Sequence, residues 1–354
     1  MKRFDIISNI TNDSSISLSM LGSVFVLGAV ASWLVGFVVC AILRLSRIMD
    51  VPNARSSHRI PTVRGGGLGI VIVLIGGMLL GGHGEECYGY IAAILVVAFI
   101  SFWDDVSGLP WRSRLLTHVV AAAIAIFTLA HYEHPFPLDA VLGGLCFLWM
   151  VGYANLFNFM DGINGLAAGQ AAVTALGCCV LGLKAGVSPL HPALVFGALV
   201  AGSASGFLPH NFPTARAFMG DVGSVSLGLC LAVLTVWLSL VGGWRLFPVL
   251  ALLQANFLMD GLITMGRRWW RGEKVQQAHR EHFYQILVQR GKSHFTVTAL
   301  ELSLQLLAVG ISWLFLRPGV LWLAVDLVTI TAMWGLFFTY CSGRRVSTRR
   351  PVSS

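Results

Sequence analysis

The hydrophobic positions of the chain form long runs, not the alternating patterns of a soluble fold. Each run approaches the ~20 residues that a helix needs to cross the hydrocarbon core of a bilayer, and short polar segments separate the runs. In lipid, helices satisfy their own backbone hydrogen bonds. The sequence therefore predicts an all-α, polytopic membrane helix bundle of about eleven transmembrane helices. The predicted spans are residues 19–43, 66–82, 88–103, 115–130, 138–157, 165–183, 191–208, 222–241, 246–265, 296–316 and 320–341.

No polar stretch is long enough for a separate soluble domain, so one integral-membrane domain over residues 1–354 is expected. The first apolar run, residues 19–43, is longer than the core of a cleavable signal peptide and is predicted to stay as a helix. The catalytic loops are then expected among the polar segments on one face of the membrane. These segments are residues 44–65, 104–114, 158–165, 209–221, 266–295 and the tail 342–354.

The net charge of +8 is distributed unevenly along the chain. Most of the 24 lysines and arginines fall in these segments, which the positive-inside rule assigns to the cytoplasm. The N-terminus is then periplasmic and the C-terminus cytoplasmic. Orientation and contact with anionic lipid explain the basic charge, so no nucleic-acid partner is expected. The seven cysteines form no C-x-x-C pair, which argues against a disulfide or zinc framework.

Carboxylates concentrate at the predicted cytoplasmic face. Asp104 and Asp105 end one span, Asp161 lies between two spans, and Asp221 precedes another. A carboxylate in or near a bilayer is costly, which makes each of these residues a functional candidate. Adjacent aspartates repel each other unless a divalent cation or a cationic partner offsets the charge. A polar cap at the helix end is the alternative reading of the Asp104-Asp105 pair.

Two further segments combine oxygen ligands with glycines. Asn155, Asn158, Asp161 and Asn164 follow one another at spacings of three, and they could supply ligands and donors for a metal-bound diphosphate. An Asx-rich turn is the alternative. In Phe218–Ser224, the glycines would let a phosphate reach the N–H groups that open the next span while Asp221 holds a cation. The alternative here is a simple helix start.

Two basic loops could bind phosphate groups. His279 and His282, with Arg280 between them, share a helix face and could donate to a diphosphate, whereas zinc lacks a third ligand nearby. In the first loop, His58 and Arg64 precede three glycines and could clamp a lipid phosphate, with charge anchoring as the alternative.

Elsewhere, Asp260 precedes Arg267 and Arg268 by about two turns, so we expect it to pair with them. Pro209 and Pro213 are expected to end the preceding span.

In this order, the segments resemble the polyprenyl-phosphate N-acetylhexosamine-1-phosphate transferases, glycosyltransferase family 4. The resemblance runs over essentially the whole chain, and the histidine motif is most similar in form to members that prime O-antigen synthesis. There are two departures from the peptidoglycan enzymes. Gly108 stands where they have a lysine, and the histidines do not form a consecutive triple. The motifs are SSHRIPTVRGGG, DDVSG, NLFNFMDGINGLAAGQ, FMGDVGS and HREHFYQ.

The resemblance implies a role for each matching residue. It makes Asp221 and Asn158 ligands of Mg²⁺, for which Mn²⁺ is a candidate substitute. It makes Asp104, Asp105 and Asp161 the catalytic carboxylates, with the aspartate pair on the side of the lipid phosphate. The implied substrate-binding residues are Asn164, His279, Arg280 and His282. The loop patterns described above add Asn155, His58 and Arg64 as further substrate-binding candidates.

The implied reaction transfers an N-acetylhexosamine 1-phosphate from a UDP-sugar to undecaprenyl phosphate at the inner membrane, releasing UMP and priming O-antigen or another envelope polysaccharide. Three questions stay open: whether the mechanism is direct or covalent, whether the protein forms a homodimer, and which sugar is transferred. The candidate sugars are N-acetylglucosamine, N-acetylfucosamine, N-acetylquinovosamine and N-acetylgalactosamine. One alternative is the phospho-N-acetylmuramoyl-pentapeptide transferase of peptidoglycan synthesis. A secondary transporter is the alternative of a different class, but transporters place ionisable groups near mid-membrane at repeat interfaces, and no repeat is visible.

Overall fold

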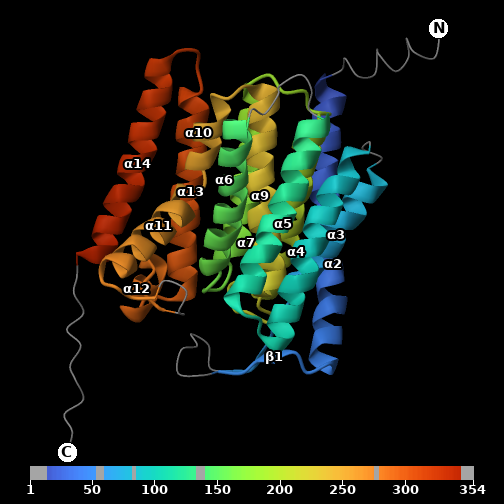
Figure 1. The fold of residues 1–354 in the computed structure, drawn as a ribbon, viewed down its shortest axis with the longest axis vertical. Helices are drawn as coiled ribbons and strands as arrows, with labels where there is room; N and C mark the ends of the chain where they lie inside the picture. The colour runs from blue at the N-terminus through green and yellow to red at the C-terminus, as the bar shows by residue number, and fades with distance from the viewer. Residues whose placement is uncertain (1–13, 53–59, 82–84, 133–139, 275–278, 344–354) are drawn as a thin grey trace, which may run out of the picture.

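The computed structural model describes residues 14–52, 60–81, 85–132, 140–274 and 279–343, and over these ranges the chain is a bundle of helices (Figure 1). The prediction of an all-α, polytopic membrane bundle is confirmed. The helices are α2 (Ser14–Leu45), α3 (Leu68–Leu80), α4 (Glu86–Ser107), α5 (Trp111–Tyr132), α6 (Ala140–Phe159), α7 (Leu166–Lys184), α8 (Pro192–Asn211), α9 (Gly220–Gly242), α10 (Leu246–Leu252), α11 (Ala255–Trp270), α12 (Phe283–Gln289), α13 (His294–Phe315) and α14 (Val320–Ser342).

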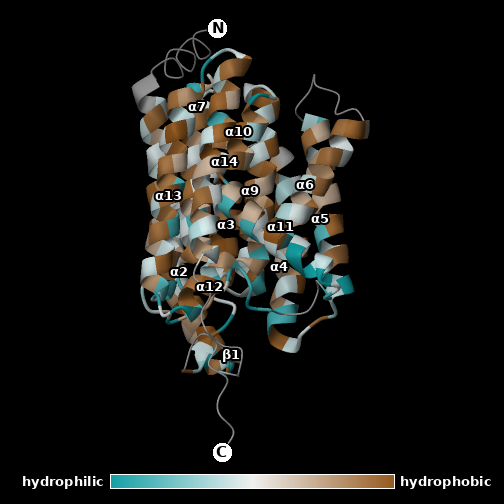
Figure 2. Cartoon of the chain, turned by 90° about the vertical axis from the view of Figure 1, so that its left-hand side faces the viewer, coloured by the Kyte–Doolittle hydropathy of each residue, from teal (hydrophilic) through white to brown (hydrophobic). Residues whose placement is uncertain are grey.

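Nine helices in the described ranges are long and apolar enough to cross a membrane. Their outer surfaces are mostly apolar, while hydrophilic residues collect toward one end of the bundle (Figure 2). The most buried of the nine is α9, in which every residue from Val222 to Leu240 is buried. A helix that is apolar all round belongs in the centre of a bundle, and α9 accordingly contacts α4, α6, α7 and α8.

Glycines allow α8 and α2 to approach each other closely. A Cβ on Gly202 of α8 would lie 2.3 Å from the carbonyl oxygen of Phe25, and a Cβ on Gly206 would lie 2.1 Å from that of Ala29. These glycines, four residues apart, therefore let the backbone of α8 rest against the backbone of α2. Small residues with this spacing are typical of helix pairs in membranes, where packing replaces the hydrophobic effect.

The structure corrects the predicted spans in three places. The span predicted over residues 246–265 is the pair α10 and α11, which meet at a bend of 73°. The span predicted over residues 66–82 is only the 13-residue helix α3. The proline at position 209 does not end α8, which continues through it to Asn211. Hydropathy reports apolar length and cannot register a change of helix direction, which explains the first error.

Two small elements in the polar loops carry no hydropathy signal. A two-stranded antiparallel ribbon pairs β1 (Met49–Asp50) with β2 (Thr62–Val63), and α12 is a helix of seven residues. Both lie at the lower end of the bundle in Figure 1, the end at which α14 finishes. The same end holds the junctions between α4 and α5, between α6 and α7, and before α9, where the candidate site lies.

Candidate active site

The glycine-rich segment before α3 lies directly beside the segment before α9. The main-chain N–H of Phe218 donates to the carbonyl of Val63 at 2.8 Å. Two further bonds run from Gly66 to Phe218 and from Gly67 to Met219, both at 2.9 Å. A Cβ on Gly67 would lie 2.4 Å from the Cα of Gly223, so no side chain fits between the two segments. Two motifs that are ~150 residues apart in sequence thus form one backbone unit.

Asp105, at the end of α4, binds the beginning of α9. Its Oδ1 accepts the N–H of Asp221 at 2.9 Å, and its Oδ2 accepts the N–H of Val222 at 3.1 Å. The first N–H groups of a helix lack partners within the helix and carry partial positive charge, so a carboxylate is stabilised there. The N–H groups that we expected to receive a phosphate are therefore bound by Asp105, and that expectation is wrong for these two donors.

Gly220 allows this arrangement. Its φ is +74°, a backbone conformation that side chains disfavour. A Cβ at this position would lie 2.4 Å from the Oδ2 of Asp105 and 2.9 Å from the backbone nitrogen of Gly65. The glycine thus lets the first loop, the aspartate pair and α9 meet at one point.

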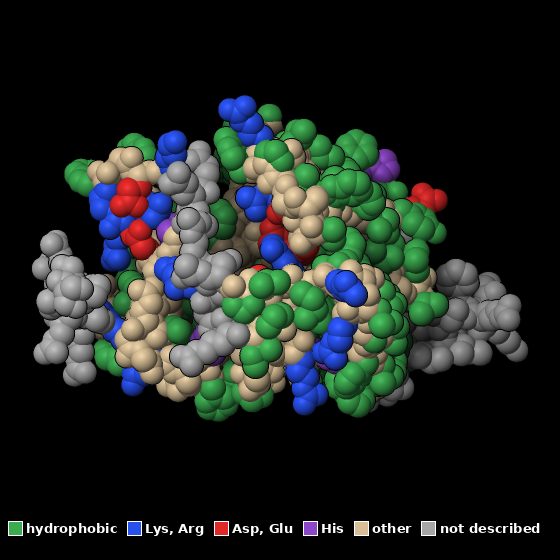
Figure 3. Space-filling model, turned by 90° about the horizontal axis from the view of Figure 1, so that it is seen from below, with side chains coloured by type: hydrophobic (Ala, Val, Ile, Leu, Met, Phe, Trp, Pro, Cys, Tyr) green, Lys and Arg blue, Asp and Glu red, His purple; other side chains and the backbone are tan. Residues whose placement is uncertain are grey.

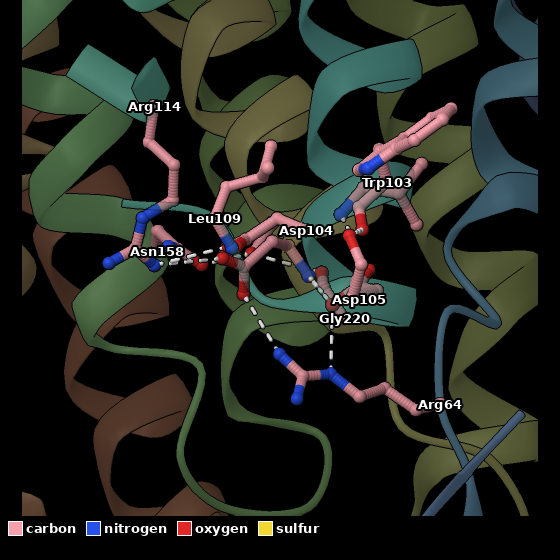
Figure 4. A network of polar contacts seen from close by, with 12 residues as sticks. Arg64, Trp103, Asp104, Asp105, Leu109, Arg114, Asn158 and Gly220 are labelled. Carbon is pink, nitrogen blue, oxygen red and sulfur yellow. Dashed lines mark hydrogen bonds and ion pairs between the residues drawn. The ribbon is translucent and has the colours of Figure 1, made fainter. Parts of the chain in front are cut away.

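Two arginines bridge the three carboxylates from opposite sides (Figure 4). Arg64 donates to Asp105 at 2.8 Å and lies 3.7 Å from Asp221. Arg114, in the first turn of α5, lies 3.2 Å from Asp104 and 3.4 Å from Asp221. The side chain of Asp104 is 5% exposed and that of Asp221 is 16% exposed, whereas both arginine side chains are 37% exposed. The carboxylates therefore lie at the bottom of the site and the guanidinium groups line its opening.

Asn158 and Asp161 lie at and just beyond the end of α6. The Oδ1 of Asn158 accepts the hydroxyl of Ser224, one turn into α9, at 2.6 Å. Burial, reinforced by the charges of Asp221 and Asp105, raises the pKa of Asp161 to about 7, and Arg64 opposes this effect. All four predicted carboxylates thus share one electrostatic environment, which holds more negative charge than its two arginines offset.

The other two asparagines of the α6 to α7 segment bond to the protein itself. The Nδ2 of Asn155 donates to the carbonyl of Val151 within α6 at 2.7 Å. The Nδ2 of Asn164 donates to the carbonyl of Pro213 at 3.1 Å, and the main-chain carbonyl of Asn164 accepts the hydroxyl of Thr298 at 2.8 Å. In this state Asn164 connects the loop before α7 with the loop after α8 and with α13.

The histidine segment lies against the α6 to α7 loop through Tyr284. The hydroxyl of Tyr284 donates to the carbonyl of Phe159 at 3.3 Å, and a Cβ on Gly162 would collide with this hydroxyl. The rings of His279 and His282 lie 4.8 Å apart. His282 is buried, so the two predicted phosphate donors differ in environment.

The predicted phosphate donors of the histidine segment also differ in charge and in exposure. Burial, together with the neighbouring His282 and Arg268, lowers the pKa of His279 to about 4. This imidazole is therefore neutral near pH 7, and it can donate a hydrogen bond without bringing a positive charge. Arg280 is exposed. His58, the remaining predicted site residue, lies outside the described residues.

Asp260 corrects one prediction. We expected it to pair with Arg267 or Arg268, but its Oδ1 lies 2.8 Å from the Nδ1 of His282. Arg268 instead pairs with Glu273 at 2.8 Å and with Glu281 at 2.6 Å. About two turns of α11 separate Asp260 from these arginines, and each contacts a different part of the following segment. Sequence spacing alone did not reveal these partners.

Magnesium suits the donors of this site. Mg²⁺ in substrate-phosphate sites typically takes one or two carboxylates, substrate oxygens and water, and does not need a cage made only of protein. Asp221, the most exposed of the three bridged carboxylates, and the amide oxygen of Asn158 offer such a partial set. No group of three or more His, Cys, Asp or Glu residues in the described ranges forms a complete metal cage.

The site opens on the face viewed in Figure 3, where acidic side chains lie in a hollow among lysines and arginines. Exposed tryptophans mark the same end of the bundle. Trp103 directly precedes the aspartate pair and is 55% exposed, Trp111 opens α5, and Trp269 and Trp270 end α11. Tryptophan is enriched at the boundary between hydrocarbon and headgroups. We therefore expect the carboxylates to lie near the depth of the lipid headgroups.

Sequence reasoning missed three residues of the site: Arg114, Ser224 and Tyr284. Arg114 lies ten positions after Asp104, beyond the turn at Pro110, and its spacing gives no helix periodicity that would place it opposite the carboxylates. One signal was available. Arg112 and Arg114 are the basic residues of the short 104–114 segment, so they were the nearest candidates to neutralise the aspartate pair.

Comparison with known proteins gives consistent matches. The family model described as glycosyl transferase family 4 matches residues 87–239, which contain the aspartate pair, the asparagine segment and Asp221. The chain is 29% identical over 297 residues to a probable undecaprenyl-phosphate N-acetylglucosaminyl 1-phosphate transferase of Bacillus subtilis, covering 80% of this chain and 81% of the relative.

Two further relatives are named for related activities. The decaprenyl-phosphate N-acetylglucosaminephosphotransferase of Mycobacterium tuberculosis strain H37Rv is 28% identical over 283 residues, covering 69% of each chain. The phospho-N-acetylmuramoyl-pentapeptide-transferase of Lactiplantibacillus plantarum is 31% identical over 202 residues, covering 50% of this chain and 61% of the relative. The similarity to the Bacillus relative thus spans more of the chain than the family model does.

Proposed function

Because the chain belongs to the polyprenyl-phosphate N-acetylhexosamine-1-phosphate transferase family, we propose that it transfers an N-acetylhexosamine 1-phosphate from a UDP-sugar to undecaprenyl phosphate. The products are a polyprenyl-diphosphate sugar and UMP. The proposed role is to prime O-antigen or a related envelope polysaccharide at the cytoplasmic face of the inner membrane. The observation that carries the proposal is the convergence of Asp104, Asp105 and Asp221 between Arg64 and Arg114.

The depth of this site supports a lipid acceptor. The phosphate of a polyprenyl phosphate lies at the headgroup level with its chain in the hydrocarbon. Trp103 and Trp111 flank the aspartate pair at that level, and the outer surface of the bundle is apolar. An acceptor phosphate could therefore reach the carboxylates from the membrane while a water-soluble donor enters from the aqueous side.

The arginines match the charge of the substrates. Two anions, a phosphate monoester and a diphosphate, must approach each other, and their repulsion requires cations nearby. In the substrate-free arrangement Arg64 and Arg114 bind carboxylates, and both retain exposed surface at the opening. We propose that they shift to phosphate oxygens when substrates bind, since guanidinium groups bind phosphate through paired hydrogen bonds.

Asp221 and Asn158 are the proposed holders of Mg²⁺, with Mn²⁺ as the candidate substitute. When bound, the ion would offset charge on the diphosphate and on the departing UMP. Ser224 already donates to the Oδ1 of Asn158, which fixes the direction in which the amide oxygen points. The protein thus prepares the amide ligand before the ion arrives.

We propose a direct transfer. An oxygen of the lipid phosphate attacks the β-phosphorus of the UDP-sugar, a new P–O bond forms, and the bond to UMP breaks. The acceptor is already largely ionised near neutral pH and needs positioning more than deprotonation. The side chain of Asp105 is 0% exposed and accepts three donors. This engagement favours Asp104 as the residue that orients the acceptor and gives Asp105 the role of holding α9.

The sugar is the least constrained part of the proposal. The Bacillus and Mycobacterium relatives are named as N-acetylglucosamine phosphotransferases, so UDP-N-acetylglucosamine is the first donor to test. The Lactiplantibacillus relative is named for the transfer of a phospho-N-acetylmuramoyl pentapeptide, which makes that group the second candidate. Against that candidate stand Gly108 in place of a lysine and the interrupted histidine motif.

The decisive assay measures UMP release by the purified protein in lipid nanodiscs. The donors are UDP-N-acetylglucosamine, the other UDP-N-acetylhexosamines and UDP-N-acetylmuramoyl-pentapeptide, each with and without undecaprenyl phosphate and Mg²⁺. The proposal expects UMP only when a UDP-N-acetylhexosamine, the lipid and Mg²⁺ are all present. UMP release in the absence of undecaprenyl phosphate would contradict the proposal. So would UMP release with UDP-N-acetylmuramoyl-pentapeptide as the only donor that reacts.

Asp221→Asn tests the metal-binding residue. We expect at least a ~100-fold loss of turnover, because the variant removes charge at the group that would hold the cation. The melting temperature should change little, since the amide fills the same space. Asp326→Asn is the matched control, because Asp326 is a buried aspartate of α14 that accepts only Ser312 in the described structure. Normal turnover of Asp221→Asn at ordinary Mg²⁺ would exclude Asp221 from the site.

A further inference from the structure

A carboxylate and an imidazole form a buried pair beside the site, and the proposed reaction does not by itself require this pair. The Oδ1 of Asp260, on α11, lies 2.8 Å from the Nδ1 of His282. The Oδ2 of Asp260 accepts the N–H of Phe283 at 2.8 Å, and the hydroxyl of Thr264 donates to Oδ1 at 3.0 Å. Asp260 is 1% exposed and His282 is 3% exposed. Both carboxylate oxygens are thus directed at one short segment.

If Asp260 is ionised, this contact fixes which nitrogen of His282 carries the proton. An ionised carboxylate only accepts hydrogen bonds, so the Nδ1 of His282 is then the donor. The Nε2 is then the nitrogen left for another partner. A carboxylate that fixes the tautomer and ring direction of a functional histidine is a common device in enzyme sites.

Neighbouring rings hold the imidazole in place. The ring of Tyr284 stacks on it with centroids 5.8 Å apart and an angle of 15°, and the ring of His279 lies 4.8 Å away on a second side. Tyr284 in turn bonds to Phe159, at the end of the helix that carries Asn158. His282 is therefore fixed relative to the loop that carries Asp161.

We infer that Asp260 is a positioning residue: it holds His282 with the proton on Nδ1 so that Nε2 serves the anionic diphosphate of the substrate. The inference rests on the proposed function for the identity of that ligand. It adds a residue of α11 that lies outside every motif of the sequence and assigns the bend between α10 and α11 a purpose, since the bend brings Asp260 to the histidine segment.

The alternative is that Asp260 only caps the start of α12. Its bond to the N–H of Phe283 would serve that purpose through Oδ2 alone. A cap does not need the bond from Oδ1 to the imidazole, because Oδ2 alone already accepts the N–H of Phe283 at the start of α12. The two roles predict different behaviour when His282 itself is replaced.

The first experiment reads the tautomer. The full-length protein is labelled with ¹⁵N-histidine and placed in nanodiscs, and long-range ¹H–¹⁵N spectra identify the protonated nitrogen, with His282→Gln assigning the signal. We expect Nδ1 to be protonated in the unaltered protein and in the control Thr264→Val, which removes a different donor to the same carboxylate. In Asp260→Asn the preference should be lost. A tautomer that does not change in Asp260→Asn would overturn the inference.

The second experiment is a double-mutant cycle in the UMP-release assay. Asp260→Asn should lower kcat/KM by about 10–100-fold, as is typical when the partner of a functional histidine is replaced. In the His282→Gln background the same change should cause little further loss, because Asp260 acts through His282. A full additional loss in that background would mean that Asp260 has a purely structural role.

The two readouts separate this inference from the proposed function. The tautomer of His282 requires no substrate, so it decides whether Asp260 positions the ring even if no UDP-sugar supports transfer. Failure of the activity assay with an intact tautomer effect would reject the reaction and keep the positioning. Activity with an unaffected tautomer would reject the positioning and keep the reaction.

Discussion

Asp105 illustrates how the same residue type can serve two purposes within one site. It was expected to act on the acceptor, yet its carboxylate accepts two N–H groups of α9 and the guanidinium of Arg64. Each bond to a charged group contributes about 1.5–3 kcal/mol when it is buried and well aligned. The neighbouring Asp104 accepts Arg114 and the N–H of Leu109. Asp104 and Asp105 therefore have different partners, although they are consecutive residues of the same type at the end of α4.

Gly220→Ala tests the close approach at this residue. The new methyl would lie within contact distance of Asp105, and the positive φ adds roughly 1–3 kcal/mol of backbone strain. We expect a lower melting temperature and a loss of most of the turnover, because the start of α9 must move away from Asp105. Gly152→Ala in α6 is the control, since a Cβ there meets nothing within 4 Å. A fully active Gly220→Ala would mean that the contact with Asp105 is dispensable.

Arg114→Gln tests the second bridge between the carboxylates. The variant keeps hydrogen-bond donors but removes the charge shared by Asp104 and Asp221. We expect kcat/KM for both substrates to fall by about 10–100-fold, the range for one lost charge-assisted contact to phosphate. Arg112→Gln is the matched control, because Arg112 lies over the ring of Trp111 and, within the part of the chain that the structure describes, forms no ion pair with these acids. Equal kinetics in the two variants would contradict a role for Arg114.

At the scale of elements, the bend between α10 and α11 is the feature that hydropathy did not indicate. A bend interrupts the helical hydrogen bonds, and inside a membrane the freed backbone groups must find protein partners. Gln170 of α7 supplies one of them, since its Nε2 donates to the carbonyl of Leu253 at 3.3 Å. The same side chain exchanges two hydrogen bonds with Asn256, each of 2.9 Å. Gln170, the last residue of the motif NLFNFMDGINGLAAGQ, thus supports the bend.

Gln170→Leu is predicted to destabilise the protein. The change leaves the amide of Asn256 without its partner and weakens the support of Leu253, at a cost of about 1–3 kcal/mol for each unsatisfied buried group. The expected result is a clearly lower melting temperature in detergent. Ser303→Ala on α13 should have little effect, because this exposed hydroxyl bonds only within its own helix. An unchanged melting temperature for Gln170→Leu would show that the amide network is not needed for stability.

For the whole molecule, the carboxylates that pair with arginines or histidine in the described ranges gather at one end of the bundle, whereas Asp326 lies buried within α14. The aspartate pair, the start of α9, the ribbon and α12 all lie there, and α14 finishes there as well (Figure 1). A secondary transporter would place its ionisable groups near the middle of the membrane, at the interface of two repeats. The observed asymmetry is what a reaction between a lipid headgroup and a water-soluble donor requires.

Orientation in the membrane can be tested with fusion proteins. The excess of lysines and arginines at the site end predicts that this end is cytoplasmic. Green fluorescent protein fused after the last residue should therefore fluoresce, and alkaline phosphatase at the same place should be inactive. The opposite pattern is expected for fusions to the N-terminus. Phosphatase activity at the C-terminus would place the carboxylates on the periplasmic side and remove access to UDP-sugars.

The sequence by itself determined the class of the fold, the positions of most helices and the set of candidate acids. This was possible because apolar length and the cost of charge in lipid act locally along the chain. It also identified His282 and Arg64 as candidates, although not their partners. Only the tertiary structure decided which groups meet: Asp105 with the start of α9, Arg114 with Asp221, and Asp260 with His282. Those contacts depend on helix packing and on the bend of 73° between α10 and α11, which arise from glycine contacts and buried amides far apart in the chain.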